Sequence, residues 1–304
     1  MANLGIRIGK LSLPNPVLTA SGTFGYGDEM ASWLDLKRLG GIVCKTVTRA
    51  PRAGNAPPRT CETSAGMLNA IGLQNVGLAR FCTEKLPFLR DCGCPIIVNI
   101  AGETIEDFAF MCRALSQEMG ISAIELNISC PNVAHGLDFA TDPHLTEDVV
   151  SCARNATDLP LLAKLSPNVS DISLIARAAH QGGADALCVA NTFVGMAIDV
   201  NTRRPRLSNV TGGLSGPAIK PLALRAVWKC AGAVPIPVIG IGGITCAQDA
   251  LEFIIAGASA VQVGTATFVQ PGATLSILEG INKYLDDNGF DDIANLVGSL
   301  KIRS

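Results

Sequence analysis

The sequence predicts an α/β protein with the (β/α)8 TIM-barrel fold, an N-terminal hairpin and long loops over the active face. Eight apolar runs of strand length recur along the chain, and helical patterns follow them. Near-continuous apolar strands are typical of parallel sheets that are covered on both faces. The chain has 304 residues, which suits one such barrel. An open doubly wound sheet is the structural alternative.

The individual elements can be assigned in chain order. The opening "MANLGIRIGKLSLPNP" alternates like a short hairpin. The runs expected to form the barrel strands are residues 16–21, 41–46, 95–100, 123–128, 161–165, 186–191, 237–242 and 260–264. Three helices carry clear end signals. They begin at Thr104, Asp171 and Cys246 and are expected to end at Gly120, Gly182 and Gly257.

Two connections exceed the usual loop length. Residues 47–75 are rich in Pro, Arg and Gly, and residues 192–217 contain "NTRRPRLSNVTGGLSG". Long loops on a barrel usually cover its active face. No Pro/Gly/Ser-rich linker divides the chain, so we predict a single domain over residues 1–304.

Composition excludes several classes of protein. The formal net charge of −2 argues against nucleic-acid binding, which requires a basic face. No apolar stretch reaches the roughly 18 residues of a membrane span, and the start does not resemble a signal peptide. Eleven cysteines occur without a CxxC pair, so we expect reduced thiols and no metal or iron–sulfur cluster on this chain. We predict a soluble cytoplasmic protein.

Polar or glycine residues stand at the ends of the predicted strands. Chemistry in barrels of this kind lies at the carboxyl ends of the strands. One asparagine at a strand end is more often a turn former than a ligand-binding residue, but many such ends on one rim indicate a binding site. The strand-end residues are Ser21, Lys45, Thr46, Asn99, Asn127, Cys130, Lys164, Asn191, Thr192, Gly242, Gly243, Gly264 and Thr265.

The last two strands end in glycine, in "GIGGIT" (240–245) and "VGTATF" (263–268). Glycine lets the backbone approach a phosphate closely, and a following helix N-terminus attracts its charge. This is the common phosphate position of the barrel fold. The alternative is that these are ordinary turn glycines.

Two lysines and one cysteine are candidates for chemistry. Lys45 and Lys164 each lie in an apolar strand, where a buried cation needs an anionic ligand or a partner such as Glu125. Cys130 lies in the polar cluster at the end of "AIELNISCPN" (123–132). Its thiol suits a general base or nucleophile, and the alternative is a small buried hydrophobe.

Taken together, several motifs resemble class I dihydroorotate dehydrogenase, from residue 18 to the last helix. The segment "KTVTRAPRAGNAPPR" (45–59) is most similar to the B subgroup. One departure is Val76, where the family pattern has proline. The remaining motifs are "NAIGLQN" (69–75), "ELNISCPN" (125–132), "AKLSPN" (163–168), "ANT" (190–192), "GGLSG" (212–216), "GIGGI" (240–244) and "VQVGTA" (261–266).

The resemblance implies FMN as cofactor and dihydroorotate as substrate. The residues implied to hold FMN are Ser21, Lys45, Thr46, Asn99, Asn127, Lys164, Ala190, Gly216, Gly242, Gly243, Gly264 and Thr265. The residues implied to hold dihydroorotate are Lys45, Asn69, Ala70, Ile71, Gly72, Leu73, Asn127, Asn191 and Thr192. No metal ligand is implied.

The resemblance also implies a mechanism and an assembly. Cys130 would remove the C5 proton while a hydride leaves C6 for the flavin, and Lys45 and Lys164 would complete the catalytic set. The product would be orotate, in pyrimidine biosynthesis. Electrons would pass to NAD through a partner subunit that carries FAD and a [2Fe–2S] cluster. The implied core is a homodimer of catalytic chains within a heterotetramer.

Three other functions stay open. A stand-alone dihydroorotate dehydrogenase would pass electrons to fumarate. A flavin enzyme similar to dihydropyrimidine dehydrogenase would bind uracil or thymine, which carry no carboxylate. A flavin-free barrel that binds a phosphate would be an isomerase or a ligand-binding protein.

Overall fold

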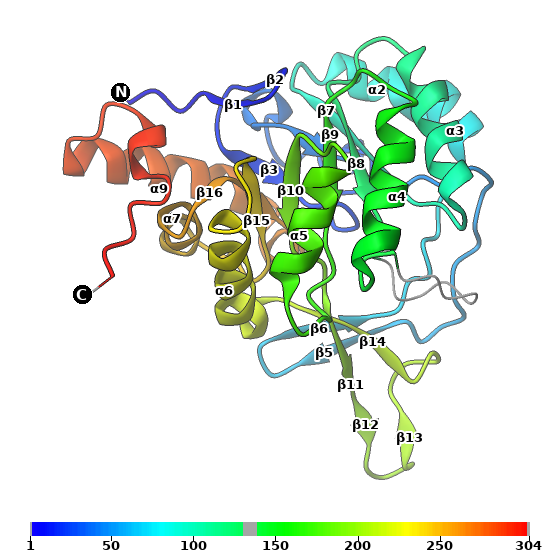
Figure 1. Cartoon of the computed structure of the whole chain (residues 1–304). Coiled ribbons are helices and arrows are strands. Elements are labelled where there is room, and N and C mark those ends of the chain that lie inside the picture. The colour runs from blue at the N-terminus through cyan, green and yellow to red at the C-terminus, as the bar shows by residue number, and fades with distance from the viewer. Residues whose placement is uncertain (1, 130–138, 303–304) are drawn as a thin grey trace.

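A computed structural model, which describes residues 2–129 and 139–302, confirms the TIM barrel (Figure 1). Eight parallel strands pair in the order β3-β16-β15-β10-β9-β8-β7-β4. A parallel bridge between Leu18 and Gly41 joins the two outer strands, so the sheet closes on itself. All eight predicted strands are present: β3 (Val17–Thr19), β4 (Ile42–Val43), β7 (Ile96–Ile100), β8 (Ala123–Asn127), β9 (Leu161–Lys164), β10 (Ala186–Val189), β15 (Val238–Ile241) and β16 (Ala258–Val263).

Helices cover the outside of the barrel (Figure 1). Between β3 and β4 the chain forms turns and the 3-10 helix η1 (Leu36–Arg38) in place of an α-helix. A π-helical turn, η2 (Phe81–Lys85), joins α1 to α2. The helices are α1 (Leu78–Arg80), α2 (Leu86–Asp91), α3 (Ile105–Ser116), α4 (Pro143–Arg154), α5 (Ile172–Gln181), α6 (Lys220–Ala231), α7 (Ala247–Ile255), α8 (Ala266–Val269) and α9 (Ala273–Asn288), with 3-10 helices η3 (Pro217–Ile219) and η4 (Ile293–Leu296). None of the helices in the described ranges is long and apolar enough to cross a membrane.

The three predicted helix starts are confirmed, and two of the three ends agree: α5 ends at Gln181 beside Gly182, and α7 ends at Ile255, two residues before Gly257. Thr104 caps α3 through a reciprocal pair of hydrogen bonds with Asp107, as its sequence predicts. The helix ends at Ser116, however, four residues before Gly120, which was expected to end it. The carbonyl of Met119 accepts a hydrogen bond from Arg90 of α2, which holds the segment beyond the helix against its neighbour.

The N-terminal hairpin is also confirmed. Strands β1 (Ile6–Ile8) and β2 (Leu11–Leu13) pair antiparallel and bury their alternate apolar side chains. Gly9 at the turn lies against Asp185, the residue that precedes β10. The hairpin therefore covers the amino ends of the strands, opposite the predicted site.

The two long connections are not simple loops. They contribute β5 (Thr60–Thr63), β6 (Gly66–Asn69), β11 (Phe193–Met196) and β14 (Thr211–Ser215) to an antiparallel sheet in the order β11-β14-β6-β5. A smaller hairpin, β12 (Ile198–Asp199) with β13 (Arg204–Pro205), extends farther from the barrel (Figure 1). Asn69 pairs with Gly213, far away in sequence, so neighbouring residues give little sign of this sheet.

The inside of the barrel is polar at its centre. Side chains two apart on a strand share a face, so Glu125 and Asn127 of β8 point inward while Ile124 and Leu126 face the helices. Glu125 and Gln262 are both 0% exposed. The strands are apolar mainly because of their outer face, which packs under the helices.

We predict that Gly240→Ala destabilises the barrel by about 1–3 kcal/mol. A Cβ at Gly240 would lie 2.5 Å from a ring carbon of the buried Phe253 of α7. Gly232→Ala is the matched control, because its nearest neighbour would be 3.6 Å away and the position is exposed. Urea unfolding should leave the control within about 0.5 kcal/mol of the parent chain. Equal unfolding free energies for the two variants would contradict this packing argument.

Candidate active site

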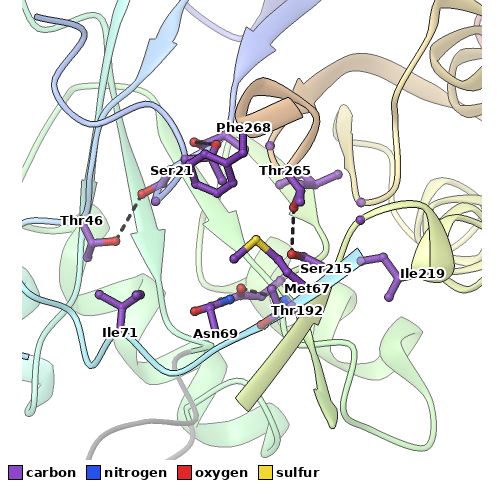
Figure 2. Close-up of a pocket in the computed structure, with 18 of the residues that line it drawn as sticks. Ser21, Thr46, Met67, Asn69, Ile71, Thr192, Ser215, Ile219, Thr265 and Phe268 are labelled. Atoms are coloured by element: carbon purple, nitrogen blue, oxygen red, sulfur yellow. Dashed lines mark hydrogen bonds between the residues drawn. The ribbon is translucent and has the colours of Figure 1, made fainter. Parts of the chain in front are cut away.

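A cavity of about 220 Å³ opens at the carboxyl ends of the barrel strands (Figure 2). One enclosed water needs only roughly 10–15 Å³, so the cavity has room for a much larger molecule. Both the barrel rim and the antiparallel sheet contribute to its walls. The predicted site residues that line it are Ser21, Lys45, Thr46, Asn69, Ile71, Gly72, Leu73, Asn127, Lys164, Ala190, Asn191, Thr192, Gly216, Gly242, Gly243, Gly264 and Thr265.

Two predicted site residues in the described part of the chain do not line the cavity. Ala70 is fully buried in a small cluster under the antiparallel sheet. Asn99 is 0% exposed and lies inside the barrel. Cys130, the predicted base, lies outside the described residues.

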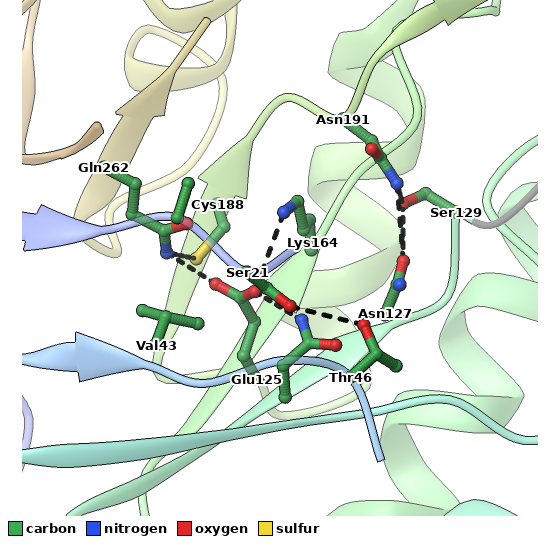
Figure 3. Close-up of polar contacts among 12 residues, drawn as sticks. Ser21, Val43, Thr46, Glu125, Asn127, Ser129, Lys164, Cys188, Asn191 and Gln262 are labelled. Atoms are coloured by element: carbon green, nitrogen blue, oxygen red, sulfur yellow. Dashed lines mark hydrogen bonds and ion pairs between the residues drawn. The ribbon is translucent and has the colours of Figure 1, made fainter. Parts of the chain in front are cut away.

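A buried carboxylate lies at the centre of the barrel (Figure 3). Glu125 accepts hydrogen bonds of 2.5 Å from Asn99 and 2.5 Å from Gln262. Its Oε1 lies 3.8 Å from Nζ of Lys164, which is 5% exposed and lines the cavity. Lys164 therefore has both the acidic partner and the cavity position that the sequence left as alternatives.

Strand register produces this arrangement. In the parallel ladders Asn99 of β7 stands beside Glu125 of β8, and Asn127 stands beside Lys164 of β9. Glu125 lies two residues before Asn127, so it points inward one layer deeper. The carboxylate layer thus lies directly below the layer that meets the cavity.

A second polar group forms the rim on the side of β8 and β10. Asn191 donates to Ser129, which in turn donates to Asn127 (Figure 3). On another wall, Nδ2 of Asn69 donates to the carbonyl of Gly213. These bonds orient three of the predicted substrate amides.

Asp249 holds the glycine turn that follows β15 through hydrogen bonds. Oδ2 of Asp249 on α7 accepts from both the backbone N–H and the hydroxyl of Thr245, and its Oδ1 accepts from Lys220 of α6 at 2.8 Å. Partial burial alone raises the pKa of Asp249, but these hydrogen bonds outweigh burial and bring that pKa to about 2. The carboxylate therefore stays charged and holds the turn between two helices.

Lys45 lines the cavity as well. Burial lowers the pKa of this lysine, and the nearby charge of Arg59 lowers it further, although Glu29 opposes both effects. The positive charges of Lys45 and Arg59 repel each other, and a bound anion would stabilise both. Arg59 was not among the predicted site residues, because its segment was interpreted as a loop and as a subgroup motif but not as a strand end.

Several apolar residues complete the cavity, and the sequence did not indicate them. Met67, Ile219, Ile241 and Phe268 line the walls, together with the hydroxyl of Ser215, which accepts from Thr265 at 2.8 Å. Figure 2 shows Met67, Ile219 and Phe268 around one open space. Apolar walls with polar ends suit a flat ring that carries polar substituents.

Comparisons with known proteins identify the family. Residues 3–285 match the family model described as dihydroorotate dehydrogenase. The chain belongs to the dihydroorotate dehydrogenase family. It is 54% identical over 299 residues to "Dihydroorotate dehydrogenase B (NAD(+)), catalytic subunit" of Geotalea uraniireducens (strain Rf4), covering 98% of each chain. It is 52% identical to the protein of the same description from Geobacter sulfurreducens and 51% to that from Thermoanaerobacter pseudethanolicus, each over 301 residues and 99% of both chains.

The site fits FMN, the cofactor that the family resemblance implies. At Gly243, with φ +74°, a Cβ would lie 2.7 Å from Cα of Lys220, so only glycine allows this close approach. Oδ1 of Asn99 is buried just inside the barrel and has no hydrogen-bond partner among the described residues. A backbone cradle and apolar walls together suit a phosphate-bearing ring.

We predict that Glu125→Ala costs about 3–5 kcal/mol of stability, because it leaves Lys164 charged and buried without its acidic partner. Glu279→Ala is the control, since it breaks a 2.8 Å pair with Arg38 in which both side chains are exposed. Its cost should be about 0–1 kcal/mol. Urea unfolding measures both. If Glu125→Ala were as mild as the control, the buried ion pair would not stabilise the barrel.

Proposed function

We propose that this chain is the catalytic chain of an NAD-linked dihydroorotate dehydrogenase, which oxidises dihydroorotate to orotate in pyrimidine biosynthesis. The observation that carries the proposal is the full-length similarity to catalytic subunits of that description. The cavity supports it independently, since cations, amides and glycine turns meet there.

FMN is the proposed cofactor. The Gly242–Gly243 turn and the Gly264–Thr265 end would hold its phosphate, and Ser21 and Thr46, whose hydroxyls lie 3.3 Å apart, would hold polar atoms at the other wall. The chemistry that this cofactor supplies is acceptance of a hydride. Lys164 would stabilise negative charge at the ring, and Glu125 keeps that lysine in place.

Dihydroorotate is the proposed substrate because it is an anion with an amide-rich ring. Lys45, with Arg59 near it, provides the positive charge for the carboxylate. Asn69, Asn127 and Asn191 provide amides for the ring. A neutral base such as uracil would leave the Lys45 side of the cavity without a counter-charge, so the charge pattern favours dihydroorotate over the dihydropyrimidine alternative.

Cys130 is the proposed general base, which takes the C5 proton as the hydride leaves C6. The other thiols of the barrel do not suit this role. Burial raises the pKa of Cys44 to about 12 and raises the pKa of Cys188 well above its ordinary value, so both stay protonated.

The proposed assembly joins this chain to a subunit with FAD and a [2Fe–2S] cluster, around a homodimer of catalytic chains in a cytoplasmic heterotetramer. The relatives' description as an NAD(+)-linked "catalytic subunit" supports a division of labour of this kind.

The first test is anaerobic reduction of the FMN-loaded chain by dihydroorotate, followed as flavin bleaching. The parent chain should bleach. Cys130→Ala should bind FMN but bleach about 10²–10⁴-fold more slowly, as expected for loss of a general base. Cys152→Ala on the outer helix α4 is the control thiol and should bleach like the parent. A parent chain that binds FMN yet stays oxidised would refute the proposed reaction, and rapid bleaching of Cys130→Ala would refute its base.

The second test concerns the electron acceptor. The purified chain should pass electrons from dihydroorotate to an artificial dye but reduce NAD only when the partner subunit is added. Robust NAD reduction by this chain alone would contradict the partner model. Turnover with fumarate would instead assign the chain to the stand-alone type.

A further inference from the structure

Ser129 lies between two of the proposed substrate amides, and none of the site assignments includes it. Its hydroxyl accepts from Nδ2 of Asn191 at 2.8 Å and donates to Oδ1 of Asn127 at 3.2 Å. Nδ2 of Asn191 also lies 3.4 Å from the same Oδ1. Ser129 is 1% exposed, whereas both asparagines line the cavity (Figure 3).

A backbone group fixes the direction of this chain of hydrogen bonds. The N–H of Thr192 can only donate, and it donates to Oδ1 of Asn191 at 2.8 Å. The amide of Asn191 must therefore turn its NH2 group toward Ser129 and Asn127. Because the NH2 group of Asn191 can only donate, the atom of the Asn127 amide that faces it must be the acceptor, Oδ1.

Ser129 also fixes the orientation of the Asn127 amide, because a hydroxyl has only one proton to donate. Ser129 accepts from Asn191, so its proton is available for Asn127, and Oδ1 of Asn127 receives two donors. Rotating the Asn127 amide by half a turn would bring its NH2 against the NH2 of Asn191. Nδ2 of Asn127 makes no hydrogen bond within residues 2–129 and 139–302, so it is the end left for a ligand.

We propose that Ser129 is a positioning residue that sets the hydrogen-bond polarity of the substrate rim. Asn127 then presents a donor to an acceptor oxygen of the ligand, and Asn191 keeps one lone pair of Oδ1 for a ligand N–H. A ring with adjacent C=O and N–H groups satisfies both. This inference rests on the proposed function, because dihydroorotate and orotate have such a ring.

The predicted consequence concerns binding of the ring. Without the hydroxyl, Asn127 loses one of the two donors that hold its Oδ1, and its amide can turn an oxygen toward the acceptor atom of the ligand. Two facing acceptors repel, so orotate and dihydroorotate should bind more weakly. The turns proposed to hold the FMN phosphate follow β15 and β16, which Ser129 does not touch, so FMN should stay bound.

Ser166→Ala is a closely matched control. Ser166 is also 1% exposed and stands two residues after the end of β9, as Ser129 stands two residues after the end of β8. Its hydroxyl accepts from Asn168, which does not line the cavity. The two substitutions therefore remove the same buried group from neighbouring strands, one at the amide rim and one beside it.

The test measures the Kd of orotate for the FMN-loaded chain by titration of the flavin spectrum. Ser129→Ala should raise Kd by about tenfold, the loss expected for one misdirected hydrogen bond, and raise KM for dihydroorotate more than it lowers kcat. Ser166→Ala should stay within about twofold. Ser129→Thr keeps the hydroxyl and should restore most of the affinity. If Ser129→Ala does not fold, Ser129→Cys, which nearly keeps the shape and weakens both hydrogen bonds, takes its place with the same expectation.

Two outcomes would overturn the inference. The first is an orotate Kd for Ser129→Ala equal to that of Ser166→Ala. The second is loss of FMN content and of orotate affinity together, which would show a general structural role. Failure of the proposed function looks different, because the parent chain itself would then neither bind orotate nor bleach with dihydroorotate.

Discussion

One buried carboxylate ties the barrel to its site. Glu125 holds side chains from β7, β9 and β16 as well as its own strand, so four strands meet at a single charge. In a medium of low dielectric, removing one partner of such a buried charge is costly. This pairing fixes Lys164 and Asn99. The position of Lys164 at the cavity therefore depends on Glu125 in the layer of side chains below it.

The sequence predicted the strands and the polar rim because both follow from local rules. Apolar runs mark strands, and the carboxyl ends of parallel strands meet at one face, so residues as distant as Ser21 and Thr265 were placed on one rim. The same rules explain the error at Gly120. A glycine is a common helix stop in sequence, but α3 ends at Ser116, and the segment before Gly120 is held by a hydrogen bond from Arg90 of another helix to Met119, which no local pattern reveals.

What the sequence did not reveal depends on contacts between distant segments. Gln262 stands in an apolar run and gives no sign of the acid it binds. Met67 and Ile219 line the cavity only because the antiparallel sheet brings their segments over the barrel. Ser129 was visible as a hydroxyl beside a strand end, yet its role follows from the N–H of Thr192, which no spacing rule connects to it.

The antiparallel sheet also bears on the order in which the chain is made. Asn69 of β6 and its partner Gly213 of β14 are 144 residues apart. At roughly 5–20 residues per second, the ribosome needs about 7–30 s to deliver the second strand after the first. The β5–β6 hairpin therefore waits with an unpaired edge through synthesis of most of the barrel. The edge that waits belongs to β6, which later pairs with β14. The other edge of the hairpin, that of β5 ("TCET"), has no partner strand in the described sheet, and its threonines and Glu62 limit pairing with other nascent chains.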